Sequence, residues 1–184
     1  MINIKLPKKK TLEECSCNDE GVPVTHLKNK VFCFDDISGE EGKLYRDKKK
    51  LNSADAAYVD SKKELYFFEF KNAPHNHIPK RSIYSKMHDS IITWNMCFAA
   101  DITLNELINK STFFVIYNDQ QSNIQRENES ISFNKIKEKQ KELAKISDRV
   151  LLWDTKRYLH TFYKEIYTID VREFEEKFAS KIFS

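Results

Sequence analysis

The sequence predicts a single α/β domain in which a mixed β-sheet is flanked by helices. Short apolar runs typical of buried strands are interspersed with segments whose apolar residues recur at helical spacing. The chain has 184 residues, enough for one substantial hydrophobic core. Neither a repeat nor a linker divides it. We therefore expect one domain over residues 1–184, with 1–23 as a peripheral or poorly ordered segment.

The composition is that of an ordinary globular protein. Hydrophobic residues make up 40% and charged residues 32%. Because the net charge is only +3, basic residues are expected to form local patches and not a positively charged surface overall. Neither a signal peptide nor an apolar stretch of about 20 residues is visible, so we expect a cytoplasmic protein that does not enter a membrane. The four cysteines form no paired C-x-x-C units, which favours free thiols over a zinc site.

Glycine is scarce, and this excludes several common functional sites. The chain has three glycines, Gly21, Gly39 and Gly42. A phosphate-binding loop of the P-loop or dinucleotide type needs several glycines at fixed offsets, and none can be built here. The G-x-S-x-G motif of serine hydrolases is also absent.

The clearest local unit is a β-hairpin. Segments 55–59 (DAAYV) and 64–71 (ELYFFEFK) have strand-like composition, and the turn-like segment 60–63 (DSKK) separates them. Asp60 is expected to be a turn residue. An earlier short apolar run at 31–34 also indicates a strand.

The remaining elements follow from apolar spacing and capping patterns. Apolar residues at helical spacing predict a long helix over 79–100, and Thr103 with Glu106 forms a capping box for a shorter one. Asp170 is expected to cap the last helix, whose apolar stripe includes Phe174 and Ile182. Further segments are predicted as strands at 113–117, 150–153 and 163–169, as a polar loop at 118–130 and as a lysine-rich helix at 133–146.

The second strand of the hairpin ends in two charged residues. Side chains alternate across a strand, so Glu69 and Lys71 share a face with Leu65 and Phe67. Both faces begin apolar, which predicts a central strand covered on both sides. A core face that ends in an acid and a base is typical of a strand that runs out into a cleft.

The expected hairpin register brings a second acid to this end of the strand. With Ala56 opposite Phe68, Asp55 meets Glu69. Two carboxylates this close repel one another unless a cation lies between them. Mg²⁺ prefers oxygen ligands, and the backbone carbonyl of Phe70 offers a third oxygen. Lys71 would then lie beside a metal-bound water.

This pattern, Asp55 followed by Glu69-Phe70-Lys71 on the next strand, resembles the signature of the PD-(D/E)xK nuclease superfamily. The resemblance covers about residues 51–117 and implies a restriction endonuclease-like fold with a Mg²⁺-dependent phosphodiesterase activity, Mn²⁺ being an alternative ion. Asp55, Glu69 and the Phe70 carbonyl would hold the metal, and Asp55, Glu69 and Lys71 would be catalytic. The chain departs from the pattern because Ala54 stands where many members have proline.

The resemblance also implies an additional acid and a nucleic-acid partner. Glu40 or Glu41 is a candidate for the acid by position alone, and Lys80, Arg81 and Lys86 are candidate phosphate contacts. DNA is the favoured substrate from the habit of the superfamily, and small nucleases of this kind often work as homodimers.

Several alternatives remain open at this point. The chain could be an RNA-cleaving toxin or defence nuclease, or a non-catalytic nucleic-acid-binding or interaction module on the same fold. Glu69 and Lys71 could be an exposed ion pair at a strand end. Lys86 could lie along the edge of the core with its ammonium in solvent. The letters His75-Asn76-His77 match another nuclease class by accident, although their place after Lys71 leaves a substrate contact open.

Overall fold

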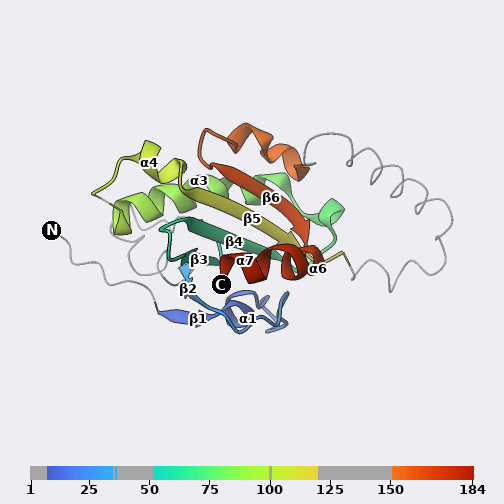
Figure 1. Ribbon diagram of the computed structural model, residues 1–184. Helices are drawn as coiled ribbons and strands as arrows, with labels where there is room; N and C mark the ends of the chain where they lie inside the picture. The colour runs from blue at the N-terminus through green and yellow to red at the C-terminus, as the bar shows by residue number, and fades with distance from the viewer. Residues whose placement is uncertain (1–7, 35, 37–51, 100, 120–150) are drawn as a thin grey trace, which may run out of the picture.

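A mixed six-stranded sheet runs through the part of the chain that the computed structural model describes, residues 8–34, 36, 52–99, 101–119 and 151–184. The strand order is β1-β2-β3-β4-β5-β6 (Figure 1). Neighbours from β1 to β4 are antiparallel, whereas β4, β5 and β6 are parallel. The strands are β1 (Lys9–Thr11), β2 (Lys30–Cys33), β3 (Ala56–Val59), β4 (Leu65–Lys71), β5 (Ser111–Tyr117) and β6 (Glu165–Asp170).

Helices cover both faces of the sheet, which gives three layers. The long helix α3 and the shorter α4 pack on one face, and α1 with the C-terminal helices packs on the other (Figure 1). The helical segments are α1 (Leu12–Cys15), η2 (His75–His77), α3 (Lys80–Phe98), α4 (Leu104–Ile108), η4 (Leu152–Tyr158), α6 (Val171–Phe174), the π-helical η5 (Glu175–Ala179) and α7 (Ser180–Ile182). This arrangement confirms the predicted α/β class.

The central position of β4 explains its two apolar faces. Leu65 and Phe67 belong to the core under α3, whereas Phe68 and Phe70 belong to the core under the C-terminal helices. Both faces are therefore buried, as the sequence predicted. Because Glu69 lies two residues after Phe67, it is on the α3 face.

The hairpin and the helix starts follow the sequence closely. The β3–β4 ladder pairs Val59 with Leu65 and Ala56 with Phe68, which is the predicted register. The capping box of Thr103 is present at the start of α4. The side chain of Asp170 caps α6 by accepting a hydrogen bond from the Arg172 N–H.

The predicted strand at 150–153 is wrong in its described residues. Leu152 begins a 3₁₀ segment, and Trp153 and Asp154 have left-handed φ angles of 56° and 58°. The turn buries Trp153, whose Nε1–H donates to the carbonyl of His75, while its own carbonyl accepts from the hydroxyl of Tyr84. These tertiary contacts outweigh the strand propensity of the apolar run.

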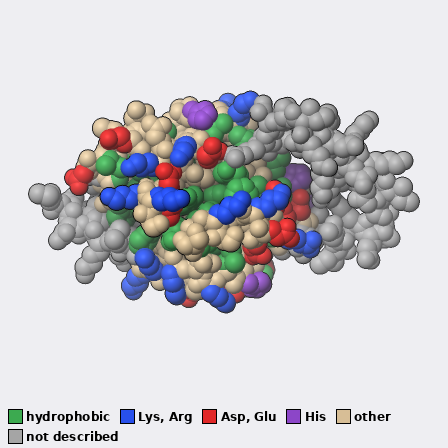
Figure 2. All heavy atoms as spheres, in the orientation of Figure 1, with side chains coloured by type: hydrophobic (Ala, Val, Ile, Leu, Met, Phe, Trp, Pro, Cys, Tyr) green, Lys and Arg blue, Asp and Glu red, His purple; other side chains and the backbone are tan. Residues whose placement is uncertain are grey.

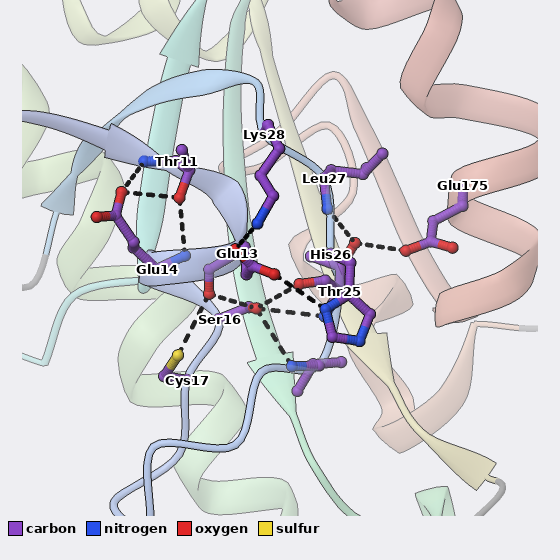
Figure 3. A network of polar contacts seen from close by, with 11 residues as sticks. Thr11, Glu13, Glu14, Ser16, Cys17, Thr25, His26, Leu27, Lys28 and Glu175 are labelled. Atoms are coloured by element: carbon purple, nitrogen blue, oxygen red, sulfur yellow. Dashed lines mark hydrogen bonds and ion pairs between the residues drawn. The ribbon is translucent and has the colours of Figure 1, made fainter.

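Residues 8–34 are tied to the rest of the molecule by α1 and the loop after it. The side chain of Leu12 is fully buried under the sheet, and β1, which the sequence did not predict, pairs with β2. Figure 3 shows the polar contacts of this segment, in which Thr25 donates a hydrogen bond of 2.5 Å to Glu175 of η5. The segment 8–34 thus packs against the C-terminal helices. All four cysteines are free thiols.

Three predictions fall wholly or mainly outside the described residues. They are the lysine-rich helix at 133–146, the loop at 118–130 beyond Asp119, and the candidate acids Glu40 and Glu41.

Candidate active site

The acidic residue of β4 is completely buried. Glu69 has no exposed surface, although it is followed two residues later by Lys71, whose side chain is 24% exposed. Glu69 is buried because β4 is central and α3 covers this face. The strand therefore carries one carboxylate into the interior just before it reaches solvent.

Asp55 approaches this carboxylate from the segment just before β3. The regular ladder ends at Ala56 and Phe68, so Asp55 and Glu69 do not continue the backbone pairing. Instead, the carboxylate of Asp55 accepts a hydrogen bond of 2.6 Å from the backbone N–H of Phe70, and its carbonyl accepts from Phe34 of the β2 side. Both bonds fix Asp55 beside the end of β4.

A lysine from α3 joins the two carboxylates. The Nζ of Lys86 lies 2.8 Å from Oδ1 of Asp55 and 2.8 Å from Oε2 of Glu69. The Nζ of Lys71 lies 2.6 Å from the other oxygen, Oε1 of Glu69. We call Asp55, Glu69, Lys71 and Lys86 the charge cluster. It balances two carboxylates against two ammonium groups.

The cluster shifts the pKa values of Glu69 and Lys86. Burial, helped by the negative charge of Asp55, raises the pKa of Glu69 to about 7. Burial alone would lower the pKa of Lys86, but Glu69 and Asp55 outweigh it and raise that pKa above its usual range. Neither oxygen of Glu69 has a hydrogen-bond partner among the described residues, so its contacts with the two lysines act as ion pairs.

The raised pKa of Glu69 predicts a pH-dependent stability of the metal-free protein. The folded state holds this proton more tightly than the unfolded chain, whose glutamates titrate near 4.5. The contribution of Glu69 to the free energy of unfolding is therefore full below about pH 4.5 and is lost as the pH rises through about 7. Urea unfolding in a chelator measures the free energy of unfolding of wild type minus that of Glu69→Gln, and this value should decline as the pH rises through the window. A value that increases with pH would contradict the assignment.

The other predicted site residues are placed as follows. Lys80 and Arg81 lie exposed in the first turn of α3. Asp60 is a turn residue, as expected, because its carboxylate accepts from the backbone N–H groups of Lys62 and Glu64.

The sequence did not predict the position of Lys86. From the sequence, Lys86 is expected only as a phosphate contact or as a lysine at the edge of the core. A signal was available, since Lys86 flanks the inward stripe of the helix, in which Ile83 and Met87 are fully buried. A lysine at that place needs an acidic partner.

The available oxygen ligands suit a hard cation, although they are few. The described residues contain no group of three or more His, Cys, Asp or Glu side chains that could hold a metal ion. The expected ligands are two carboxylates and one backbone carbonyl, with water completing the shell. Two neighbouring carboxylates, of which Glu69 has no hydrogen-bond partner among the described residues, fit that demand. In this structure the ammonium group of Lys86 supplies the positive charge between the two carboxylates.

Comparisons of this chain with models of protein families, with curated proteins and with solved structures gave no significant match. Within the described residues, the helices are too short or too polar to span a membrane.

Proposed function

We propose that this chain is a metal-dependent nuclease with a restriction endonuclease-like fold and a PD-(D/E)xK site, and that it hydrolyses phosphodiester bonds, with DNA as the expected substrate. One observation carries the proposal. A fully buried glutamate at the end of a central strand lies near a second carboxylate, and among the described residues its two oxygens form ion pairs with two lysines.

Such an arrangement is costly for the fold. Removing a carboxylate from water costs several kcal/mol, and ion pairs in the interior repay this only with good hydrogen bonds. Glu69 has none among the described residues. Charged groups with strongly shifted pKa values occur most often at functional sites. A catalytic role gives a reason for the chain to retain this group.

The residues of the cluster have distinct roles in the proposal. Asp55, Glu69 and the carbonyl of Phe70 would hold Mg²⁺ or Mn²⁺. The bound ion would supply an activated water and would polarise the phosphate. Lys71, whose ammonium is fixed by Glu69 and partly exposed, would stabilise the negative charge that develops on the phosphate oxygens.

The order of elements also supports the proposal. An antiparallel hairpin (β3–β4), a long helix (α3) and an apolar strand (β5) follow one another, which is the order on which the resemblance depends. The parallel pairing of β4 and β5 places the end of β4 at the carboxyl edge of the sheet, where α/β proteins commonly bind ligands.

Contacts with nucleic acid would come from local basic groups. On the face shown in Figure 2, lysine and arginine side chains form several separate groups with acidic side chains between them. Lys80 and Arg81 are exposed on the same helix as Lys86 and are suited to bind phosphates flanking the cluster.

Replacing Lys86 with methionine should have opposite effects on metal binding and on stability. Metal binding requires the Lys86 ammonium to leave the space between Asp55 and Glu69, so its removal should lower the Kd for Mg²⁺ by roughly tenfold, equivalent to about 1.4 kcal/mol. The metal-free protein should lose stability, because the fully buried Glu69 and the partly buried Asp55 lose their shared cation. Isothermal titration with Mg²⁺ and urea unfolding measure the two effects.

Lys80→Met is the matched control, since Lys80 is exposed on the same helix. It should change neither quantity. If Lys86→Met weakened Mg²⁺ binding instead, Lys86 would belong to the metal-binding arrangement and the displacement model would be wrong.

The position of Lys86 also favours a second candidate, a non-catalytic binding module. Here the four charges form a permanent structural cluster with Lys86 as its cation. Titration of Mn²⁺ and Mg²⁺ separates the two, because this module would bind neither ion. Cleavage assays on DNA and on RNA with either ion then separate the DNA nuclease from an RNA-cleaving enzyme. Absence of cleavage of both would refute the nuclease proposal.

A further inference from the structure

A histidine is held in a fixed orientation just beyond the charge cluster. His75 begins the 3₁₀ turn that follows β4, and its Nδ1 lies 3.0 Å and 3.2 Å from the two carboxylate oxygens of Asp119. Its backbone N–H also donates to Asp119, at 3.1 Å. The carboxylate therefore fixes both the loop and the ring. In the tautomer whose Nδ1–H donates to Asp119, Nε2 carries the lone pair of the ring.

The ring lies on the same face of the sheet as Lys71. Tyr117 pairs with Lys71 in the parallel β4–β5 ladder, so their side chains are neighbours, about 4.8 Å apart in the direction of the strand spacing. The ring of His75 packs on that of Tyr117, with centroids 5.6 Å apart. In addition, the backbone N–H of Asn118 donates to the carbonyl of Lys71. The residue before Asp119 is thus tied directly to the cluster.

A strained turn at Trp153 and Asp154 also holds the backbone of His75. Trp153 and Asp154 both adopt left-handed φ angles, which cost non-glycine residues free energy and occur preferentially at functional sites. This turn directs the indole N–H of Trp153 to the carbonyl of His75, at 3.0 Å. Asp119 therefore holds the backbone N–H of His75, and Trp153 holds its carbonyl.

In the proposed reaction the charge cluster offers no good proton acceptor. Asp55 and Glu69 would be occupied as metal ligands, and Lys71 is paired with Glu69 as an ammonium group. Hydrolysis of a phosphodiester nevertheless requires a proton to leave the attacking water.

We propose that His75, oriented by Asp119, is the general base that takes this proton in the nuclease reaction; the inference rests on the proposed function. The water oxygen forms a bond to phosphorus while one of its protons moves to Nε2 of His75. The bond from phosphorus to the leaving oxygen breaks. The imidazolium, still bonded to Asp119 through Nδ1–H, then returns the proton to the leaving oxygen or to solvent.

The test compares His75→Ala with wild type in a DNA cleavage assay with Mg²⁺. We expect kcat to fall by about 100-fold or more, and free imidazole in the buffer to restore part of the activity. His77→Ala is the matched control, since His77 is exposed in the same turn, and it should retain wild-type activity. The loss should persist on a diester with a nitrophenolate leaving group, which needs no proton.

The outcomes separate the two proposals. Wild-type protein that cleaves nothing refutes the nuclease itself. Active wild type with unchanged His75→Ala overturns only the inference. Folded His75→Ala, verified by circular dichroism, that imidazole cannot rescue would reduce His75 to a positioning residue. A loss confined to poor leaving groups would make it a general acid; either result overturns the base assignment.

Discussion

Glu69→Gln is expected to reduce metal-dependent cleavage by roughly a thousandfold. Loss of groups that merely support a metal ligand costs about 10–100-fold, and loss of a ligand itself costs more. Glutamine preserves the volume of a fully buried side chain, so the fold should be retained. The variant should also lose Mg²⁺ affinity, because an amide supplies one neutral oxygen where the carboxylate supplied a charge. Single-turnover cleavage and calorimetric titration measure the two losses.

Glu64→Gln provides the matched control for this variant. Glu64 precedes the opposite end of the same strand, where it pairs with Lys164 at 3.2 Å and is partly exposed. Its replacement should leave cleavage and metal binding near wild type. If Glu69→Gln cleaved as well as wild type and Glu64→Gln, Glu69 would be excluded as a metal ligand and the PD-(D/E)xK interpretation would be wrong.

Phe67→Ala is expected to lower the free energy of unfolding by about 3–5 kcal/mol. The side chain is fully buried on the α3 face of β4, two residues before Glu69. Its ring packs against those of Phe34, Trp94, Phe113 and Tyr163, with centroid separations of 5.5–6.1 Å. Truncation would leave a cavity at the centre of this core. Because whole domains have only about 5–15 kcal/mol of stability, the loss would be severe.

Urea unfolding followed by tryptophan fluorescence checks this expectation. Phe162→Ala is the comparison, since that ring is only partly buried at the margin of the same core, and it should cost clearly less. Similar losses from both variants would mean that Phe67 is not central to the core. Chelator should be present, so that stabilisation by bound metal does not mask the effect.

The hairpin and its charged end were predictable from residues 55–71. Small residues opposite large ones fixed the register, since Ala56 and Ala57 face Phe68 and Phe67. Alternation along β4 placed Glu69 on an apolar face. The approach of Asp55 followed from this register, although its side chain, not its backbone, bonds to β4. The catalytic roles of these residues are still predictions.

The turn at Trp153 and the pairing of β1 could not be predicted in the same way. The apolar run at 150–153 has strand propensity, but Trp153 lies in a turn, where it forms hydrogen bonds with His75 and Tyr84. The strand β1 is three residues long and carries two lysines, so alternation gives little signal there.

By itself, the sequence determined the local elements of this protein: the hairpin register, the long helix, the capped starts of α4 and α6, and the burial of β4 on both faces. Their signals arise from neighbouring residues and from the periods of strand and helix. Only the tertiary structure decided that Lys86 bridges Asp55 and Glu69, and that Asp119 orients His75. These contacts join residues 31 and 44 positions apart. Such pairs form only where the packing of α3 and the parallel order of β4 and β5 bring distant segments together, and no local pattern encodes that packing.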